Sequence, residues 1–263
     1  MAHTPFKTVG MVGLGKMGGA VAKALVNQGT KVFAFDPNLK VSPVEGVTLV
    51  STLERLEEEA GLFVIAVKPN LVGPVLSEFK KPSIFVSIAA GITYEQLLSF
   101  SPKASTCVRV MPNLPLVSKR GAMGYYCNDE AVSHVERLFY GMGECVRISK
   151  ESLMDAVTGL SGSGPAYVLT FLQAMAEAGL QEGLSYEESL ALSLETIEGT
   201  LVYFRELRTK DHAIHPMEVR NWVTSPGGTT IHGLDALERG GFSTAVRDAV
   251  KRATERSKEL GKG

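Results

Sequence analysis

The sequence predicts an α/β protein in which a doubly wound parallel sheet is followed by an all-α helical part. Up to about Ser149, short apolar runs alternate with amphipathic stretches, which is the rhythm of repeated strand–helix–strand units. A glycine-rich turn directly follows the first apolar run. From Ser152 onward the strand-like runs stop and helical periodicity replaces them. We therefore expect two domains, over residues 1–150 and 151–263.

The first domain is expected to contain five parallel strands with helices between them. The predicted strands are Thr8–Val12, Lys31–Phe35, Leu62–Val67, Ile84–Ile88 and Thr106–Val110. The predicted helices are Lys16–Asn27, Leu53–Ala60, Leu71–Phe79 and Tyr94–Phe100. Two further strands, Gly124–Cys127 and Cys145–Ile148, are expected around a helix at Ala131–Tyr140. Because parallel strands end at one edge of the sheet, the loops that leave them face a common crevice.

The second domain is expected to be helical and to pair with another copy. Pro165–Leu180 is apolar on nearly every face, and a helix without a solvated face must be buried on all sides. Since about 110 residues are too few to enclose it, we expect burial between subunits of a homodimer or larger homo-oligomer. The last helix is predicted over Thr244–Leu260, with two i,i+4 ion pairs, Asp248–Arg252 and Lys251–Glu255.

The composition is that of an ordinary globular protein. The chain has 263 residues, of which 44% are hydrophobic and 21% are charged. Lys and Arg number 27 against 28 Asp and Glu, so no bulk charge attracts nucleic acid or an anionic membrane. The three cysteines, Cys107, Cys127 and Cys145, lack CxxC spacing, and no apolar run reaches the length of a membrane span. We expect a cytoplasmic protein.

The turn Gly13-Leu14-Gly15-Lys16-Met17-Gly18 predicts a dinucleotide site. It follows the apolar run Val9–Val12 and opens an amphipathic helix. The first glycine permits a tight turn, the second lets the backbone approach a pyrophosphate, and the third lets the helix pack on the strand. The phosphates would lie at the positive end of the helix. The pattern is typical of a Rossmann-like domain, and the alternative is a glycine-rich turn without a ligand.

Asp36 closes the second predicted strand. An acidic side chain there accepts hydrogen bonds from the adenosine ribose and repels a 2′-phosphate, which favours NADH over NADPH. The alternative is that Asp36-Pro37-Asn38 is only a turn, and Lys40 lies near enough in sequence to rescue phosphate binding. The expected cofactor is therefore NADH or NADPH, with a preference for NADH.

Three further loops are expected to border the cofactor. Ala66-Val67-Lys68-Pro69 and Ala89-Ala90-Gly91 follow the third and fourth strands, and their small residues and proline let a dinucleotide lie close to the backbone. Lys68 is interpreted as solvated or as a backbone tether rather than as a catalytic amine. Met111-Pro112-Asn113 follows the fifth strand, where Asn113 would hydrogen-bond the nicotinamide amide.

Ser225-Pro226-Gly227-Gly228-Thr229-Thr230 predicts a small anion site in the second domain. The run combines a helix-initiating turn, two unhindered glycines and two hydroxyls, and the amides at a helix start bind anions. The alternative is a plain turn between helices. Gly159–Tyr167 is interpreted either as a cap and hinge or as a substrate contact. His212 and His215 lack a third ligand, so we expect surface or capping roles and no metal.

Over nearly its whole length the chain resembles the Δ1-pyrroline-5-carboxylate reductase family. The residues that carry the resemblance are Gly13–Gly18, Ala66–Pro69, Val110–Asn113, Asp155–Tyr167, and above all Val223–Gly233 with Leu237–Phe242. The resemblance implies a Rossmann domain followed by a helical dimerisation domain, with the substrate site near the subunit interface. It implies an NAD(P)H-dependent oxidoreductase of proline biosynthesis, which delivers hydride to the carbon of a cyclic imine.

The resemblance also implies roles for the residues of the predicted anion site. Gly228, Thr229 and Thr230 would offer backbone amides to the substrate carboxylate, with Ser225 in the same turn, and the Thr230 hydroxyl would hydrogen-bond the ring nitrogen. Thr230 is therefore the catalytic candidate. Because a protonated imine is already an electrophile, the main requirements are orientation and exclusion of water. One position departs from the family, which usually has Asp where this chain has Asn221.

Two other functions compete with the reductase interpretation. A 3-hydroxyacid dehydrogenase has a similar start but carries a catalytic lysine in the helix after its second glycine-rich stretch, and Pro165–Ala178 contains no lysine. A non-catalytic dinucleotide sensor would need no small-acid site such as Gly228–Thr230. Cofactor oxidation that depends on added pyrroline-5-carboxylate distinguishes the reductase from the sensor.

Overall fold

The computed structural model describes residues 5–261 and divides into two compact units. The first unit is formed by the residues up to Pro165 together with those from Val250 onward, and the second is Ala166–Ala249. The last helix, α11 (Phe242–Leu260), therefore contributes residues to both units. The division at residue 150 stays a prediction.

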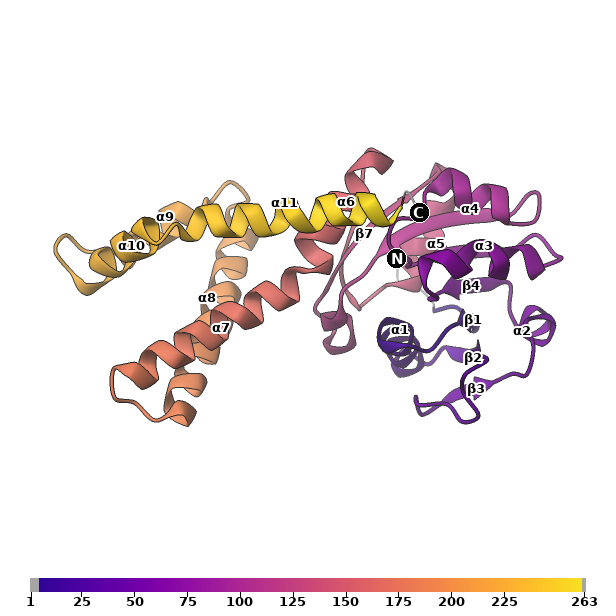
Figure 1. Cartoon of the computed structure of the whole chain (residues 1–263), viewed down its shortest axis with the longest axis horizontal. Coiled ribbons are helices and arrows are strands. Elements are labelled where there is room, and N and C mark those ends of the chain that lie inside the picture. The colour runs from indigo at the N-terminus through magenta and orange to yellow at the C-terminus, as the bar shows by residue number, and fades with distance from the viewer. Residues whose placement is uncertain (1–4, 262–263) are drawn as a thin grey trace. The chain divides into compact units, whose positions relative to one another are not determined.

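The first unit contains an eight-stranded sheet in the order β3-β2-β1-β4-β5-β6-β7-β8 (Figure 1). Strands β1 to β6 are parallel, β7 is antiparallel to β6, and β8 is parallel to β7. The order reverses between β1 and β4, which is where a doubly wound sheet opens its ligand crevice. The strands are β1 (Thr8–Val12), β2 (Lys31–Phe35), β3 (Val47–Leu49), β4 (Leu62–Ile65), β5 (Ile84–Ser87), β6 (Thr106–Met111), β7 (Gly121–Cys127) and β8 (Gly143–Arg147).

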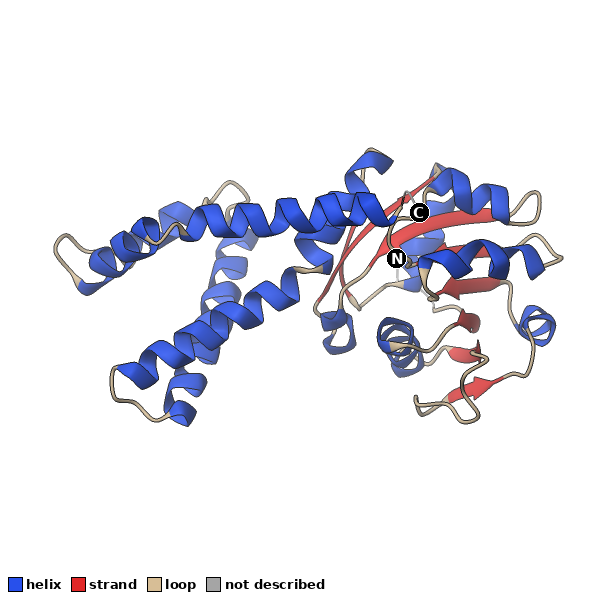
Figure 2. Cartoon of the chain, in the orientation of Figure 1, coloured by secondary structure: helices blue, strands red, loops and turns tan. Residues whose placement is uncertain are grey.

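Helices pack beside the sheet of the first unit (Figure 2). Between helices and sheet lie two separate hydrophobic cores. One core contains side chains of α1 and α5, and the other contains side chains of α2, α3 and α4. The α-helices are α1 (Lys16–Asn27), α2 (Leu53–Glu59), α3 (Pro69–Glu78), α4 (Tyr94–Phe100), α5 (Val132–Leu138) and α6 (Met154–Val157). Short 3₁₀ turns are η1 (Leu114–Ser118), η2 (Asp129–Ala131) and η3 (Glu151–Leu153), and η4 (Thr158–Gly162) is a π-helical turn. The predicted doubly wound sheet is confirmed.

Two differences from the expected elements have simple local causes. Strand β3 was not predicted, because three residues are too few to show an alternating pattern. Helix α3 begins at Pro69, and the preceding strand β4 ends at Ile65, earlier than expected. Proline is favoured at the first helical position because its missing N–H needs no partner there, so Pro69 opens the helix.

The described part of the second unit is entirely helical, as expected. Its helices are α7 (Gly164–Gln181), which begins in the first unit, α8 (Tyr186–Lys210), α9 (Pro216–Trp222), α10 (Thr229–Arg239) and the first part of α11. A capping box between Ser185 and Glu188 starts α8.

The two ion pairs predicted along the last helix are wrong. Arg252 pairs with Glu255 at 3.6 Å and Arg256 with Glu259 at 2.7 Å, both at i,i+3 spacing. On a helix surface, a residue is a neighbour of the residues three and four positions away. A long Arg side chain can therefore pair with a carboxylate at either spacing. These exposed pairs contribute little to stability.

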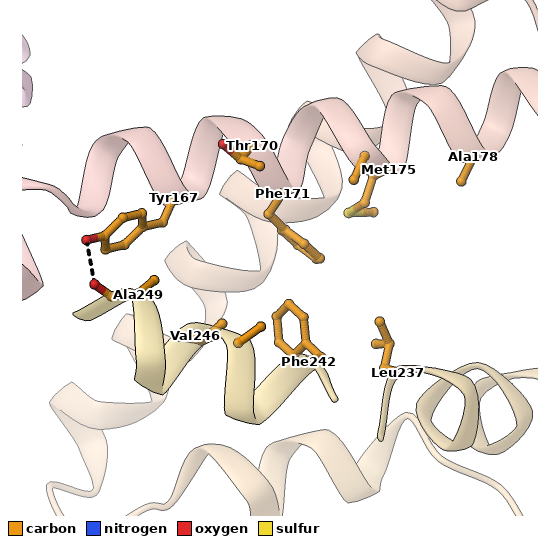
Figure 3. A pocket seen from close by; sticks show the side chains of 11 residues that line it. Tyr167, Thr170, Phe171, Met175, Ala178, Leu237, Phe242, Val246 and Ala249 are labelled. Atoms are coloured by element: carbon orange, nitrogen blue, oxygen red, sulfur yellow. Dashed lines mark hydrogen bonds between the residues drawn. The ribbon is translucent and has the colours of Figure 1, made fainter. Parts of the chain in front are cut away.

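Helix α7 is not enclosed within one chain. Ala176 is its one buried residue among those described, while Leu169 is 63% exposed. An apolar cavity of about 490 Å³ lies between α7 and α11 in the second unit, and Phe171 and Phe242 point into it (Figure 3). Along residues 5–261, no helix has both the length and the apolar character needed to cross a membrane. An apolar helix left open to water in one chain fits burial by another copy.

Candidate functional site

The glycine-rich turn joins β1 to α1, and each of its three glycines has a distinct structural reason. Gly13 has φ +92°, and a Cβ there would lie 2.7 Å from the carbonyl oxygen of Ala66. A Cβ on Gly18 would clash with the Gly13 carbonyl, so the third glycine permits the close packing of helix on strand. A Cβ on Gly15 would meet no atom within 4 Å, which leaves this side of the turn open to a ligand.

The amides at the start of α1 are the anion-binding groups of this turn. Gly15 is the N-cap, so Lys16, Met17 and Gly18 supply N–H groups that have no partner within the helix. The N–H of Leu14, in contrast, donates to Asp36 Oδ2 at 2.9 Å. Leu14 is also buried in the core. Its amide is therefore engaged in the bond to Asp36, and its side chain packs in the protein interior.

Asp36 follows β2 and holds the glycine-rich turn in place. Its Oδ2 accepts from Leu14, and its Oδ1 accepts from the Asn38 backbone at 3.1 Å. The second bond confirms a turn at Asp36-Pro37-Asn38. Oδ1 also accepts from Asn38 Nδ2 at 3.4 Å, whereas Oδ2 keeps a free acceptor position, so a ribose contact stays a prediction. The bond to Leu14 was not anticipated, because it connects the ends of two strands that only the sheet brings side by side.

The loops after β4 and β5 leave the same edge of the sheet as the glycine-rich turn. Ala66 donates its N–H to the Val12 carbonyl at 2.8 Å, directly beside the turn. Val67 is half-buried, and Lys68 is the N-cap of α3 with an exposed side chain, which agrees with a backbone role. Ala89 is buried, and its N–H donates to Ser87 Oγ at 3.3 Å. The topology therefore brings these predicted cofactor segments to one edge of the sheet.

The side chain of Asn113 already has two protein partners. It is buried, with Nδ2 donating to the Ser161 carbonyl at 3.0 Å and Oδ1 accepting from the Ala122 N–H at 2.8 Å. The amide therefore braces the start of β7 against the π-helical turn η4. Its contact with the nicotinamide amide stays a prediction.

The predicted anion site lies between α9 and α10, and α10 begins at Thr229 as the motif indicates. Gly227 has φ +68°, and the Gly228 N–H donates to the Ser225 carbonyl at 3.2 Å, which closes the turn. The Gly228 amide is thus already used. The amides of Thr229 and Thr230 lie in the first turn of α10, where helical geometry leaves them without a partner. Thr230 is half-buried, whereas Thr229 and Ser225 are exposed.

The other candidate residues have local roles. Asn221 is exposed on α9, and its Oδ1 accepts from Arg220 at 3.1 Å. His215 caps α9, with Nδ1 accepting from the Met217 N–H at 3.2 Å, which confirms the capping interpretation. Within residues 5–261, no group of three or more His, Cys, Asp or Glu is placed to hold a metal.

The cysteines are poor nucleophiles. Burial raises the pKa of Cys127 to about 11 and that of Cys145 to about 12, and it also raises the pKa of Cys107. The thiolate is the reactive form of cysteine, so these thiols are protonated and unreactive at neutral pH.

Comparison with known proteins identifies the family in both halves of the chain. Residues 151–260 match the pyrroline-5-carboxylate reductase dimerisation model, and residues 8–91 match the model described as NADP oxidoreductase coenzyme F420-dependent. Pyrroline-5-carboxylate reductase 3 of Rattus norvegicus is 35% identical over 97% of both chains. The Aquifex aeolicus reductase is 35% identical over 96% of this chain and 97% of its own.

Solved structures agree with the sequence relatives. The Plasmodium falciparum pyrroline carboxylate reductase, described with NADP bound, has a TM-score of 0.86 and 32% identity over 97% of this chain and 99% of its own. The Streptococcus pyogenes reductase has a TM-score of 0.85 and 27% identity over 96% of this chain and 98% of its own. The chain belongs to the pyrroline-5-carboxylate reductase family.

Proposed function

We propose that this protein is a pyrroline-5-carboxylate reductase. It transfers hydride from NADH or NADPH to the imine carbon of 1-pyrroline-5-carboxylate and forms L-proline, as an oxidoreductase that acts on a CH–NH group in proline biosynthesis. The observation that carries the proposal is the match to reductases of this name along 97% of the chain, in both units. Neither a 3-hydroxyacid dehydrogenase nor a non-catalytic sensor is favoured by these matches.

The cofactor site that supports this function is the crevice beside β1 and β4. The open space at Gly15 and the unpaired amides of Lys16–Gly18 fit a pyrophosphate, and Ala66–Pro69 and Ala89–Gly91 border it. When bound, the reduced nicotinamide supplies the hydride. We infer a preference for NADH from the charge of Asp36, although the Plasmodium falciparum relative is described with NADP.

The substrate site that we propose is the start of α10. The amides of Thr229 and Thr230 hold the carboxylate, and the Thr230 hydroxyl holds the ring nitrogen of the imine. Gly228 shapes this turn with Ser225 rather than donating its own N–H. Since a protonated imine accepts hydride without further activation, the protein mainly orients the ring and excludes water.

A homo-oligomer and a cytoplasmic location complete the proposal. The match to a dimerisation model and the exposed apolar residues of α7 support pairing with a second copy. All three cysteines are free thiols, which is typical of a reducing compartment.

The experiment that tests the function is turnover of the purified protein. Loss of the near-ultraviolet absorbance of NADH or NADPH should require added pyrroline-5-carboxylate. Thr230→Ala should lower kcat/KM by ~10- to 100-fold through loss of a partly buried hydrogen bond. Thr230→Ser, which keeps the hydroxyl, should retain most of the activity, and Thr200→Ala, an exposed threonine of α8, should retain all of it.

Two results would count against the assignment. Cofactor binding without substrate-dependent oxidation would support the sensor instead. Unchanged kinetics of Thr230→Ala would remove Thr230 from the mechanism and leave the reductase activity in place.

A further inference from the structure

The loop between β5 and α4, which contains Ala89-Ala90-Gly91, is held by contacts with two residues from later in the chain. At its end, the N–H of Tyr94, the first residue of α4, donates to Glu151 Oε1 at 2.5 Å. In its middle, Gly91 has φ +80° and lies backbone to backbone against Gly261. A Cβ built on Gly261 would lie 2.5 Å from the Gly91 carbonyl oxygen. This loop therefore depends on two residues that are distant in sequence.

Glu151 belongs to a polar network that extends to Ser257 of α11, and the Ser257 carbonyl accepts from the Gly261 N–H at 3.3 Å. Arg109 lies on β6 beside Ser87 of β5, and its side chain is 6% exposed. Its guanidinium pairs with Glu151 Oε1 at 3.2 Å and with Asp155 Oδ1 at 3.5 Å. Ser257 of α11, only 2% exposed, donates its hydroxyl to the same Asp155 oxygen at 2.7 Å. A buried guanidinium with two carboxylates is geometrically demanding, so these side chains hold one another in place.

The network fixes the loop through two routes. Arg109 orients Glu151, and the carboxylate of Glu151 then receives the first amide of α4. Asp155 holds Ser257, which is four residues before Gly261 on the last turn of α11, so the contact of Gly261 with Gly91 follows from it. All of these residues lie in the first unit. Together, Arg109, Glu151, Asp155, Ser257 and Gly261 are named the loop clamp.

We propose that the loop clamp is a positioning device for the cofactor, a role that rests on the proposed dinucleotide site. By holding Ala89–Gly91 in one conformation before the cofactor arrives, the clamp removes an ordering cost from binding. Its residues belong to the first unit, whereas the proposed substrate turn at Thr229 and Thr230 belongs to the second. Loosening the clamp should therefore weaken cofactor binding and leave the hydride step nearly unchanged.

Gly261→Ala tests the route through α11. The added methyl group would press on the Gly91 carbonyl oxygen. The Kd for NADH and NADPH, measured by fluorescence titration, should rise about 5- to 10-fold, with a matching rise in the cofactor KM. The kcat and the KM for pyrroline-5-carboxylate should stay within about twofold. Lys258→Ala, exposed on the same turn of α11, is the matched control and should bind as the unmodified protein does.

Glu151 tests the second route and provides a rescue. Glu151→Ala removes the acceptor for the Tyr94 N–H and should raise the cofactor Kd, whereas Glu151→Gln keeps an acceptor oxygen and should restore much of the affinity. If the role of Glu151 were purely structural, Glu151→Ala and Glu151→Gln would both have a lower thermal midpoint of unfolding. The cofactor KM and kcat would then change together, and KM would not rise alone.

The outcomes separate this inference from the proposed function. An unchanged Kd in Gly261→Ala and Glu151→Ala, or a fall in kcat at constant Kd, overturns the loop clamp. If the unmodified protein binds cofactor but does not turn over pyrroline-5-carboxylate, the reductase assignment fails while the Kd comparison still decides the clamp. If it binds no cofactor, both fail.

Discussion

Asp36 shows how much one residue does beyond its predicted role. Its position after the second strand indicates a ribose contact, and in the structure its carboxylate also ties the backbone of Leu14 to that of Asn38. The glycines of the neighbouring turn were predictable one by one, because each requirement is local to the turn. The bond to Leu14 was not, because the two residues are 22 positions apart and meet only across β1 and β2.

Asp36→Asn tests the predicted role in cofactor selection. The amide oxygen can keep one of the two backbone hydrogen bonds, from Leu14 or from Asn38, and the negative charge that repels a 2′-phosphate is gone. The ratio of kcat/KM with NADH to kcat/KM with NADPH should fall about tenfold, measured by steady-state kinetics with each cofactor.

The control is Asp211→Asn. Asp211 accepts from the Ala213 N–H at 2.9 Å in a turn of the same kind, far along the chain in the second unit, so its replacement should leave the cofactor ratio unchanged. An unaltered ratio in Asp36→Asn would remove Asp36 from cofactor selection.

Among the elements, the connection from β6 to α7 adds most to its sequence interpretation. The segment after β6 leaves the end of the strand, and the Asn113 side chain joins β7 to η4. A strand end can be predicted from an apolar run, but the direction of a side chain in the following loop depends on what packs there. The helix starts at Lys16 and Thr229 were predictable, because glycine-rich turns before them are local signals.

Asn113→Asp tests this brace. The substitution keeps the shape and the acceptor for the Ala122 N–H, but it turns a donor into a carboxylate oxygen that faces the Ser161 carbonyl in a buried place. The free energy of unfolding from urea denaturation should fall by about 1–3 kcal/mol. Asn27→Asp, exposed at the end of α1, should change it by less than about 0.5 kcal/mol. A similar small change in both variants would contradict the bracing role.

For the whole molecule, the decisive feature is the apolar surface that one chain leaves open. Val168 and Leu169 on α7 are 51% and 63% exposed. The sequence indicates that this helix needs a partner, because it is apolar on nearly every face. The structure adds that most of its length is uncovered within one chain, which agrees with the dimerisation model that matches this part of the chain.

Leu169→Glu should therefore dissociate the oligomer without unfolding the chain. The side chain already faces water in a single chain, so a charge there costs little until a second copy buries it. The mass from sedimentation or light scattering should drop to that of one chain, with an unchanged circular dichroism spectrum. Gln181→Glu, exposed at the end of α7, should keep the oligomer. An oligomer that survives Leu169→Glu would place the interface elsewhere.

Apolar periodicity and glycine positions are local properties of the chain, so they are enough to predict the doubly wound sheet, the glycine-rich turn and the helical second part, while the family resemblance rests on specific motifs such as Val223–Gly233. Which polar groups are already engaged is known only from the folded structure: the carboxylate of Asp36, the amide of Asn113, the N–H of Gly228 and the guanidinium of Arg109. Most of these bonds join residues far apart in sequence, and the bond of Gly228 depends on the path of its turn. Their hydrogen-bond partners are therefore set by how strands, helices and turns pack together. A local sequence pattern contains no information about this packing.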